Sequence, residues 1–308
     1  MLVKYGFLKK QKTQRYRCKK CLKCCSDAEK RTFGTLRSKP EKIIMVVNLL
    51  TEGVGVRAAG RLAGCHRDTV LRILRHAGTR SYELLKKKLD GVKVNRIEAD
   101  EVWTKVYRSA EKDTNPESDM NGWGDFYIFL GIEATSKLLM MPTIGKRSER
   151  HTEMFANDLA KCTDGRFQLS TDGFKPYKEK MKAAFGDRID FAQFYKERNM
   201  LNANKKFTGK RKALKITRAG NPNKSLVTTA HVERVNLSLR HYNKRFTRKS
   251  ISFSKDEEYL AHSVYLFVAS YNFCKVHKGI LGKQTPAMAS GLTDRVWKSQ
   301  DLLSLNAL

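Results

Sequence analysis

The sequence predicts an α/β protein, in which a mixed β-sheet flanked by helices is preceded by a small helical domain and a cysteine-rich segment. Three observations predict this organisation. From residue 96 onward, apolar strand-like runs alternate with amphipathic helical runs. Three short helical patterns fill residues 41–79, and residues 1–36 are basic and cysteine-rich, without a long apolar stripe. Strands and helices that alternate within one stretch of chain are typical of a sheet covered by helices on both faces.

The balance of charge indicates a polyanionic partner. The 308 residues include 61 Lys and Arg against 31 Asp and Glu, which leaves a formal net charge of +30. Such a charge repels itself in a compact fold unless a polyanion lies nearby, and each nucleic-acid phosphate that a Lys or Arg neutralises releases a counterion. No apolar run approaches 20 residues and no signal peptide is indicated. We therefore expect a nucleic-acid partner, no membrane partner and a cytoplasmic location.

Residues 1–36 hold four of the seven cysteines. An odd number of cysteines, crowded in this way, favours a reducing compartment and a metal-type cluster over a disulfide framework. Cys18 and Cys21 form a C-x-x-C pair, which offers two thiolates to Zn²⁺. A structural zinc site has four ligands, so zinc is expected only if a second, upstream pair exists. Two interpretations stay open: a partial zinc ribbon, or a cysteine cluster that binds no metal.

Three short helices and a helical connector are predicted in residues 37–90. Gly53 and Gly78 are expected to end the first and third helices. A tight turn around Gly64 separates the second and third, which is the layout of a helix-turn-helix, whose second helix enters the DNA major groove. An ordinary helical bundle with a basic surface is the alternative. The helices are expected at 41–53, 56–64 and 66–78, the connector at 81–91, and the DNA contacts at His66, Arg67, Arg72 and Arg75.

Residues 91–275 are predicted to form the mixed sheet with helices on both faces, followed by a C-terminal tail at 276–308. The polar, basic stretch 196–226, rich in Gly and Asn, is expected to be a loop or an arm inserted in this domain. Thr229 is expected to cap the helix that follows it. The expected strands are 96–103, 126–134, 137–145, 167–173 and 188–196, and the expected helices are 148–162, 174–186, 228–246 and 256–273.

Three acidic residues stand out in this cationic chain. Asp100 lies inside a strand, where a buried charge is costly without a partner, while Asp172 closes another strand and Glu233 lies in a helix. Carboxylates from separate elements can converge on hard divalent cations such as Mg²⁺ or Mn²⁺. Two such ions about 4 Å apart can activate an attacking hydroxyl and stabilise the leaving 3′ oxygen of a phosphodiester. Each acid also has an ordinary explanation in a turn or on a helix surface, and Glu98 or Glu101 could take the role of Asp100.

The chain around Glu233 is strongly basic. Residues 196–250 contain sixteen Lys or Arg and two acids, Glu197 and Glu233. An acid kept in such a stretch hints at function, and we interpret the segment as a phosphate-binding channel around the helix of Glu233. A solvated basic surface is the alternative. His231 is a candidate to orient Glu233 or to donate to a phosphate, or it is a packed histidine. The candidate DNA contacts here are Arg234, Asn236, Arg240, Lys244, Arg248 and Lys249.

Six motifs run through the chain: QRYRCKKC at 14–21, GVGVRAAGRLAG with TV at 53–70, EADEVW at 98–103, TDGFKPY at 171–177, HVERVNLSLR at 231–240 and RKSISFSK at 248–255. Together they resemble one family, the transposases of the insertion-sequence-one type within the DDE superfamily. The resemblance spans roughly residues 7–275. The last two motifs are the most specific, because they lie close together in the chain.

The resemblance implies a ribonuclease H-like catalytic fold, a helix-turn-helix that reads the terminal inverted repeats of an insertion sequence, and a zinc-binding N-terminus. By motif, Asp100 and Asp172 match the two catalytic aspartates and Glu233 matches the glutamate. The implied activity is cleavage of double-stranded DNA and strand transfer with two Mg²⁺ or Mn²⁺ ions. The implied protein is prokaryotic, nucleoid-associated and a homo-oligomer when element ends are paired. The alternative is a DNA-binding regulator, derived from a transposase, that no longer cuts.

Overall fold

The structure, a computed structural model, describes residues 2–8, 13–26, 33, 36–108, 122–196, 213–248, 250–280 and 282–303. Lys249, one of the residues predicted to contact DNA, lies outside these ranges. None of the helices within them combines the length and the apolar composition needed to cross a bilayer.

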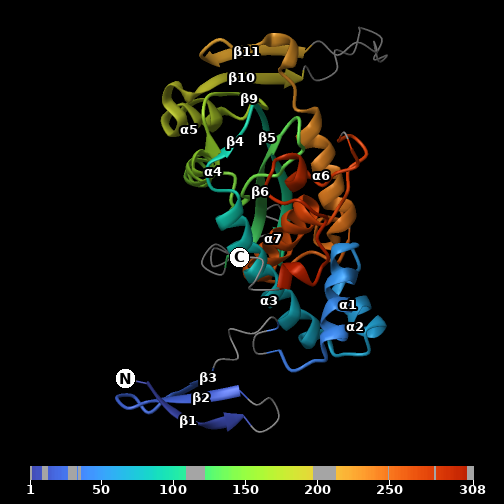
Figure 1. Cartoon of the computed structure of the whole chain (residues 1–308). Helices are drawn as coiled ribbons and strands as arrows, with labels where there is room; N and C mark the ends of the chain where they lie inside the picture. The colour runs from blue at the N-terminus through green and yellow to red at the C-terminus, as the bar shows by residue number, and fades with distance from the viewer. Residues whose placement is uncertain are drawn as a thin grey trace.

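A three-stranded antiparallel sheet forms the N-terminal part, at the opposite end of the molecule from the last strands of the main sheet (Figure 1). Its strands are β1 (Leu2–Leu8), β2 (Thr13–Cys18) and β3 (Cys24–Ser26). The guanidinium groups of Arg15 and Arg17 lie 5.6 and 5.3 Å from the ring centroid of Tyr5. Contacts between basic and aromatic side chains therefore contribute to the stability of this small sheet.

Three helices follow: α1 (Pro40–Thr51), α2 (Val56–Leu62) and α3 (Arg67–Lys88). The predicted end of the third helix at Gly78 is wrong, because α3 continues through the expected connector. A Cβ on Gly78 would lie only 2.4 Å from the Cβ of His262 on α7 (Glu257–Phe273). Gly78 thus permits a close contact between two helices and does not end one.

Six strands form the main sheet, in the order β11-β10-β9-β5-β6-β7. The chain first makes the antiparallel neighbours β5, β6 and β7, and then adds β9 and β10 parallel to β5, with β11 antiparallel at the edge. The mixed sheet predicted from the sequence is confirmed. The strands are β5 (Arg96–Val106), β6 (Gly124–Glu133), β7 (Thr143–Gly145), β9 (Phe167–Thr171), β10 (Ile189–Lys196) and β11 (Ala213–Ala219), and β4 (Val92–Lys93) pairs separately with β8 (Thr163–Asp164).

Two segments differ from the expectation. The strand expected at 137–145 is reduced to β7, because the backbone of Leu139 is bonded to the side chain of Asn272 on α7, at 2.9 Å for its N–H and 2.8 Å for its carbonyl. The expectation of a loop over 196–226 is wrong at β11, which pairs with β10. Arg218 of β11 donates to Gln193 and Tyr195 of β10, so side chains reinforce the ladder.

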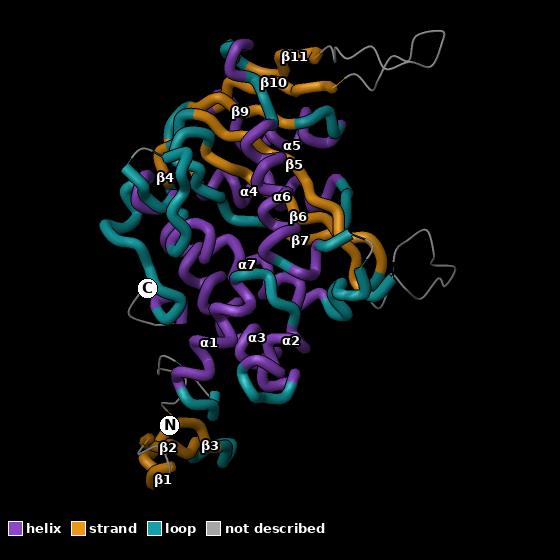
Figure 2. Tube along the Cα trace, turned by 90° about the vertical axis from the view of Figure 1, so that its right-hand side faces the viewer, coloured by secondary structure: helices purple, strands orange, loops and turns teal. Residues whose placement is uncertain are grey.

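Helices cover both faces of the main sheet, as Figures 1 and 2 show. The pair α4 (Glu149–Cys162) and α5 (Lys175–Phe185) lies on one face, and α6 (Ala230–Tyr242) lies on the other against β5 and β6. The more apolar α7 packs along α3 and ties the helical triplet to the sheet. Single 3₁₀ turns lie at η4 (Gly186–Arg188), η5 (Lys224–Leu226) and η6 (Lys244–Phe246).

The C-terminal segment contains α8 (Pro286–Ala289) and the 3₁₀ turn η7 (Asp301–Leu303). It packs on the end of α7. The ring centroids of Trp297 and Phe273 lie 4.6 Å apart, and the backbone N–H of Trp297 donates to the Phe273 carbonyl at 2.9 Å. The domain boundaries after residues 36, 90 and 275 stay predictions.

Candidate metal centre

The candidate centre forms where β9 ends beside the longer strand β5. The two strands pair only as far as Ala99 and Thr171. Beyond this pair, Asp100 and Glu101 of β5 have no neighbour on β9, and Asp172 lies directly after the last residue of that strand. Consecutive residues of a strand normally point to opposite faces, but here the end of β9 leaves a gap that both side chains reach.

Asp100, Glu101 and Asp172 each place a carboxylate oxygen within 4.8 Å of the other two, close enough to hold one metal ion. Asp100 and Asp172 also line a pocket of about 600 Å³, together with Glu233 from the first turn of α6. The three acids predicted from the sequence therefore face one pocket, although their catalytic roles stay a prediction. The other lining residues are Arg147, Gly173, Phe174, Lys175, Phe194, Tyr195 and Thr229.

Asp100 faces α6. The Asn236 Nδ2 donates to its Oδ2 at 2.7 Å, which fixes the carboxylate relative to the helix that carries Glu233. Burial raises the pKa of Asp100 to about 7, with further contributions from the negative charges of Glu101, Asp172 and Glu233. A cation placed among these acids would offset the cost of both burial and repulsion.

Glu101 faces the side of the sheet covered by α5. Arg147 pairs with it at 2.5 Å, and the Tyr177 hydroxyl donates to its second oxygen at 3.0 Å. The Arg147 guanidinium also lies 4.1 Å from the ring centroid of Phe174. Glu101 and Phe174 together fix the position of this guanidinium. Burial, followed by repulsion from Asp172, raises the pKa of Glu101 even though Arg147 opposes the shift.

The turn after β9 holds Asp172 in place. The backbone N–H of Phe174 donates to the Asp172 Oδ1 at 3.0 Å. From β10, the Gln193 Nε2 donates to the carbonyls of Asp172 and Phe174 at 2.9 and 3.1 Å. A Cβ on Gly173 would lie 2.3 Å from the ring of Tyr195, so only glycine lets β10 approach this turn so closely. Burial raises the pKa of Asp172 as well.

Glu233 is placed by the way α6 begins. Thr229 is the residue before the helix, as expected, but its hydroxyl donates to the Glu233 Oε1 at 2.7 Å and makes no bond to the helix backbone. The carboxylate of the fully buried Glu98 accepts from the N–H groups of His231 and Val232 instead. Glu98 is thereby committed to the start of α6, and His231 points to Glu98, with its Nδ1 at 2.6 Å.

The donor set fits a hard divalent cation. Carboxylate oxygens are the ligands that Mg²⁺ and Mn²⁺ prefer. Burial and mutual repulsion raise the pKa values of Asp100, Glu101 and Asp172 even with Arg147 beside them. At about 600 Å³, the pocket lined by the acids and Arg147 is also large enough to admit a phosphate.

The residues predicted to contact DNA are distributed unevenly. His66, Arg67 and Arg72 are exposed at the start of α3, whereas Arg75 is tied to α7 by an ion pair with Glu258 at 3.0 Å. Arg234, Lys244 and Arg248 are exposed on or after α6. Asn236 is buried and donates to Asp100, and its contact with DNA stays a prediction. Arg240, half-buried on the same face of α6, has an Nε with no hydrogen-bond partner among the described residues.

The cysteine pair lies in the N-terminal sheet. Cys18 ends β2 and Cys21 occupies the turn that leads to β3. Hydrogen bonds from the backbone of Cys21 and Lys20 lower the pKa of the Cys18 thiol, which favours the thiolate that zinc requires. Within the part of the chain that the structure describes, however, no three cysteines lie close enough together to hold an ion. Zinc binding stays a prediction.

No sequence pattern marks Arg147, Tyr177 or Gln193. The bond from the Thr229 hydroxyl to Glu233 is not marked either. Arg147 follows β7 and reaches Glu101 across 46 residues of sequence. Gln193 and Tyr177 lie in ordinary strand and helix patterns. Because these contacts depend on how strands and helices align, no local motif marks them. The adjacency of Glu101 to Asp100 was the one visible signal.

No protein-family model matches this chain, and no curated protein matches it in sequence. Among solved structures, the chain is similar to a piggyBac transposase synaptic complex with hairpin DNA, determined by cryo-electron microscopy. The similarity covers 88% of this chain and 72% of that one, at 9% identity and a TM-score of 0.38. Similarity at this level is too weak to carry an argument about fold or activity.

Proposed function

We propose that the chain is a DNA transposase of the insertion-sequence-one type, with a ribonuclease H-like catalytic domain that cuts and joins phosphodiesters. One observation carries the proposal: in a chain of net charge +30, acids from β5, from the end of β9 and from α6 line one pocket. The succession of three antiparallel strands, a helix and two further strands parallel to the first supports the ribonuclease H-like part.

Asp100, Asp172 and Glu233 would hold two Mg²⁺ or Mn²⁺ ions, with Glu101 beside them. Bound there, the ions would supply activation of the attacking hydroxyl and stabilisation of the leaving 3′ oxygen. The chain's own residues keep the acids in register: Asn236 orients Asp100 through its amide, and the Thr229 hydroxyl orients Glu233.

Two arginines are our candidates to bind the scissile phosphate. Arg147 lines the pocket and is anchored by Glu101 and the ring of Phe174. Arg240 lies one helical turn after Asn236, on the face of α6 that carries Glu233. The Arg240 Nε is buried and has no hydrogen-bond partner among the described residues, so we propose that the terminal amines of its guanidinium donate to a phosphate oxygen. Such charge-assisted bonds are among the strongest in proteins. The two guanidinium groups would fix the phosphate relative to the acids.

The terminal inverted repeats would be read by α2 and α3 as a helix-turn-helix. Cys65 closes the turn with an N–H bond to the Gly60 carbonyl at 2.9 Å, and α3 then begins with exposed His66 and Arg67. A recognition helix contacts bases with such N-terminal residues. Bringing two element ends together would require at least two copies of the chain.

The proposal is tested with the purified full-length protein and labelled duplexes copied from the DNA on either side of its gene. We expect strand cleavage that leaves a 3′ hydroxyl, requires Mg²⁺ or Mn²⁺, and disappears in Asp100→Ala while DNA binding is kept. Asp187→Asn, on an exposed turn far from the pocket, is the matched control and should cut normally. Binding without cleavage under either cation would identify a regulator and refute the enzyme.

A further inference from the structure

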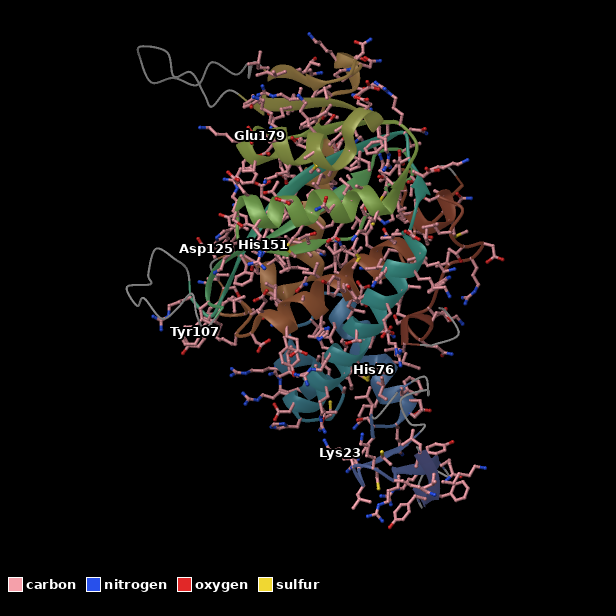
Figure 3. The ribbon with its side chains drawn as sticks, turned by 90° about the vertical axis from the view of Figure 1, so that its left-hand side faces the viewer. Lys23, His76, Tyr107, Asp125, His151 and Glu179 are labelled. Carbon is pink, nitrogen blue, oxygen red and sulfur yellow. The ribbon has the colours of Figure 1, made fainter. Side chains whose placement is uncertain are left out.

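A surface of aromatic and basic side chains lies at the end of β5 distant from the acids. Tyr107 and Trp123 stack with their ring centroids 4.2 Å apart and their planes 19° apart. The Arg108 guanidinium lies 5.5 and 5.4 Å from these two rings. Tyr107 is 43% exposed, and Figure 3 shows it at the edge of the molecule. The stacked pair therefore offers an aromatic face and a cation to solvent together.

Phe253 extends this surface and carries two amines. The Lys255 Nζ lies 3.6 Å and the Lys105 Nζ 4.4 Å from its ring centroid, and Lys255 also reaches Tyr107 at 5.6 Å. The backbone N–H of Tyr107 donates to the Ser254 carbonyl at 2.9 Å, which fixes this segment beside β5. The six side chains thus come from three segments and form one surface.

Lys105 and Lys255 carry two of the positive charges on this surface. In the described ranges, neither Lys105 nor Lys255 makes an ion pair with a carboxylate. Partial burial, followed by repulsion from Lys105 and Arg57, lowers the pKa of Lys255. Tyr107 also has a φ of 64°, a left-handed conformation that side chains other than glycine rarely adopt. The neighbouring positive charges of Lys105 and Lys255 favour an anionic ligand. The exposed ring of Tyr107, on a strained backbone, favours a ligand with planar groups that can stack on it.

We propose that Lys105, Tyr107, Arg108, Trp123, Phe253 and Lys255 bind an unpaired stretch of the DNA strand that extends from the pocket of the acids. The choice of DNA rests on the proposed function. Unpaired bases stack on aromatic rings while Lys and Arg bind the backbone phosphates, and this combination tolerates any sequence. A duplex would leave the rings without a partner, because its bases are already stacked on each other.

Strand β5 fixes how far this surface lies from the acids. Six residues separate Asp100 from Val106, which at the rise of an extended strand is about 20 Å. At the 3.4 Å rise of a B-form strand this distance corresponds to roughly six nucleotides, and an extended unpaired strand covers it with fewer. The bound stretch should therefore lie within about six nucleotides of the bond that is cut.

The first experiment measures binding of fluorescein-labelled oligothymidine by anisotropy, in buffer with Ca²⁺ so that no strand is cut. In the double variant Lys105→Gln/Lys255→Gln, we expect the affinity for the oligonucleotide to fall at least tenfold. The slope of log K against log salt concentration should become shallower by about 1.4, because two phosphate contacts with a single strand are lost. Tyr107→Leu should weaken binding about fivefold or more through lost stacking. Lys86→Gln/Lys87→Gln, exposed on α3, and Tyr82→Leu are the matched controls and should bind as the wild type does.

The second experiment keeps an aromatic side chain in place, so that misfolding cannot explain the result. Benzoylphenylalanine replaces Tyr107, or Tyr82 as the control, and is crosslinked to the bound oligonucleotide. Fe²⁺ is then added to occupy the acid pocket of the crosslinked complex. Added hydrogen peroxide oxidises it to Fe³⁺ and yields hydroxyl radicals that cut the strand nearby, while ascorbate regenerates Fe²⁺. We expect crosslinks from position 107 only, with the cut within about six nucleotides of the crosslink.

The outcomes separate this inference from the proposed function. Wild-type protein that cuts DNA with Mg²⁺, but whose lysine variants bind oligothymidine normally and whose position 107 does not crosslink, would refute the surface alone. Crosslinks and lost affinity in a protein that never cuts DNA would uphold the surface and refute the enzyme. If the same variants instead abolish binding of an acidic peptide and leave oligothymidine binding unchanged, the surface is a protein interface.

Discussion

Glu98 on β5 and His231 on α6 are joined twice: the Glu98 carboxylate accepts from the His231 backbone N–H at 2.8 Å and faces its ring Nδ1 at 2.6 Å. Asp100 lies two residues after Glu98, and Glu233 lies two residues after His231. This junction between strand and helix therefore sets the separation of two acids of the candidate centre.

Replacement of Glu98 should loosen that junction. Glu98→Ala leaves the N–H groups of His231 and Val232 without their acceptor, and we expect the free energy of unfolding to fall by about 3 kcal/mol. Glu98→Gln keeps one acceptor oxygen, so its free energy of unfolding should fall by less. The Mn²⁺ affinity of this variant should still fall, because Glu233 is held less firmly. Urea unfolding and Mn²⁺ titration measure both. Glu179→Gln, an exposed acid on α5, is the control. Equal stability of Glu98→Ala and this control would contradict the account.

The burial of Asp100 makes stability depend on pH. The Asp100 pKa is about 7 in the folded protein against 3.8 for an ordinary aspartate, so the folded state holds its proton more tightly than the unfolded chain. The stability contributed by the protonated form is therefore lost as the pH rises from about 4 to 7. Asp100→Asn should be more stable than the wild type at pH 8 without divalent cation, by on the order of 3 kcal/mol, and the gain should shrink toward pH 4.

The same pair of proteins tests the cation. Mn²⁺ should raise the melting temperature of the wild type at pH 8, because it binds the folded state alone, and should leave Asp100→Asn unchanged. Calorimetry measures both. An equal rise in the two proteins, or none in either, would show that Asp100 holds no cation.

Replacement of Arg147 should change the affinity for Mn²⁺ and the rate of DNA cleavage in opposite directions. Arg147→Gln removes a positive charge that pairs with Glu101 at 2.5 Å, so Mn²⁺ should bind roughly tenfold more tightly. The same change removes a guanidinium from the pocket wall, so DNA cleavage should slow. Arg150→Gln, an exposed neighbour, should change neither property. Mn²⁺ titration and single-turnover cleavage give the two values, and a parallel fall in both would point to misfolding instead.

Gly78 should be intolerant of a side chain. Gly78→Ala forces a methyl group to within 2.4 Å of the His262 Cβ and 2.6 Å of its Cα, so α3 and α7 must move apart. We expect a loss of about 2 kcal/mol in the free energy of unfolding. Thr79→Ala, one residue further on the exposed face of the helix, should leave stability unchanged or raise it slightly. If the two variants unfold alike, the helices are not in contact at Gly78.

How far the sequence predicts this structure depends on the range of the interactions. Most strands and helices of the main sheet follow from local periodicity, and Asp100, Asp172 and Glu233 could be singled out as rare acids in a basic chain. The convergence of these acids on one pocket depends on the end of β9 at Thr171 beside Ala99, a register that no local pattern encodes. Glu101 is present in the cluster for the same reason.

The errors have a common physical cause. A glycine in a helical pattern reads as a helix end, but the contact with His262 explains Gly78 better. Residues 213–219 look like part of a polar loop because the edge strand β11 needs few apolar side chains, and its bonds to Gln193 and Tyr195 appear only in the folded sheet.

The central claim, that acids from two strands and a helix act as one metal centre, is tested most directly by anomalous X-ray diffraction from crystals soaked in Mn²⁺. We predict a strong anomalous peak beside the carboxylates of Asp100 and Asp172, with a second near Glu233 when DNA is bound. The peak should be lost in Asp172→Asn crystals. A saturating soak that leaves the pocket empty, or places the Mn²⁺ elsewhere on the protein, would contradict the claim.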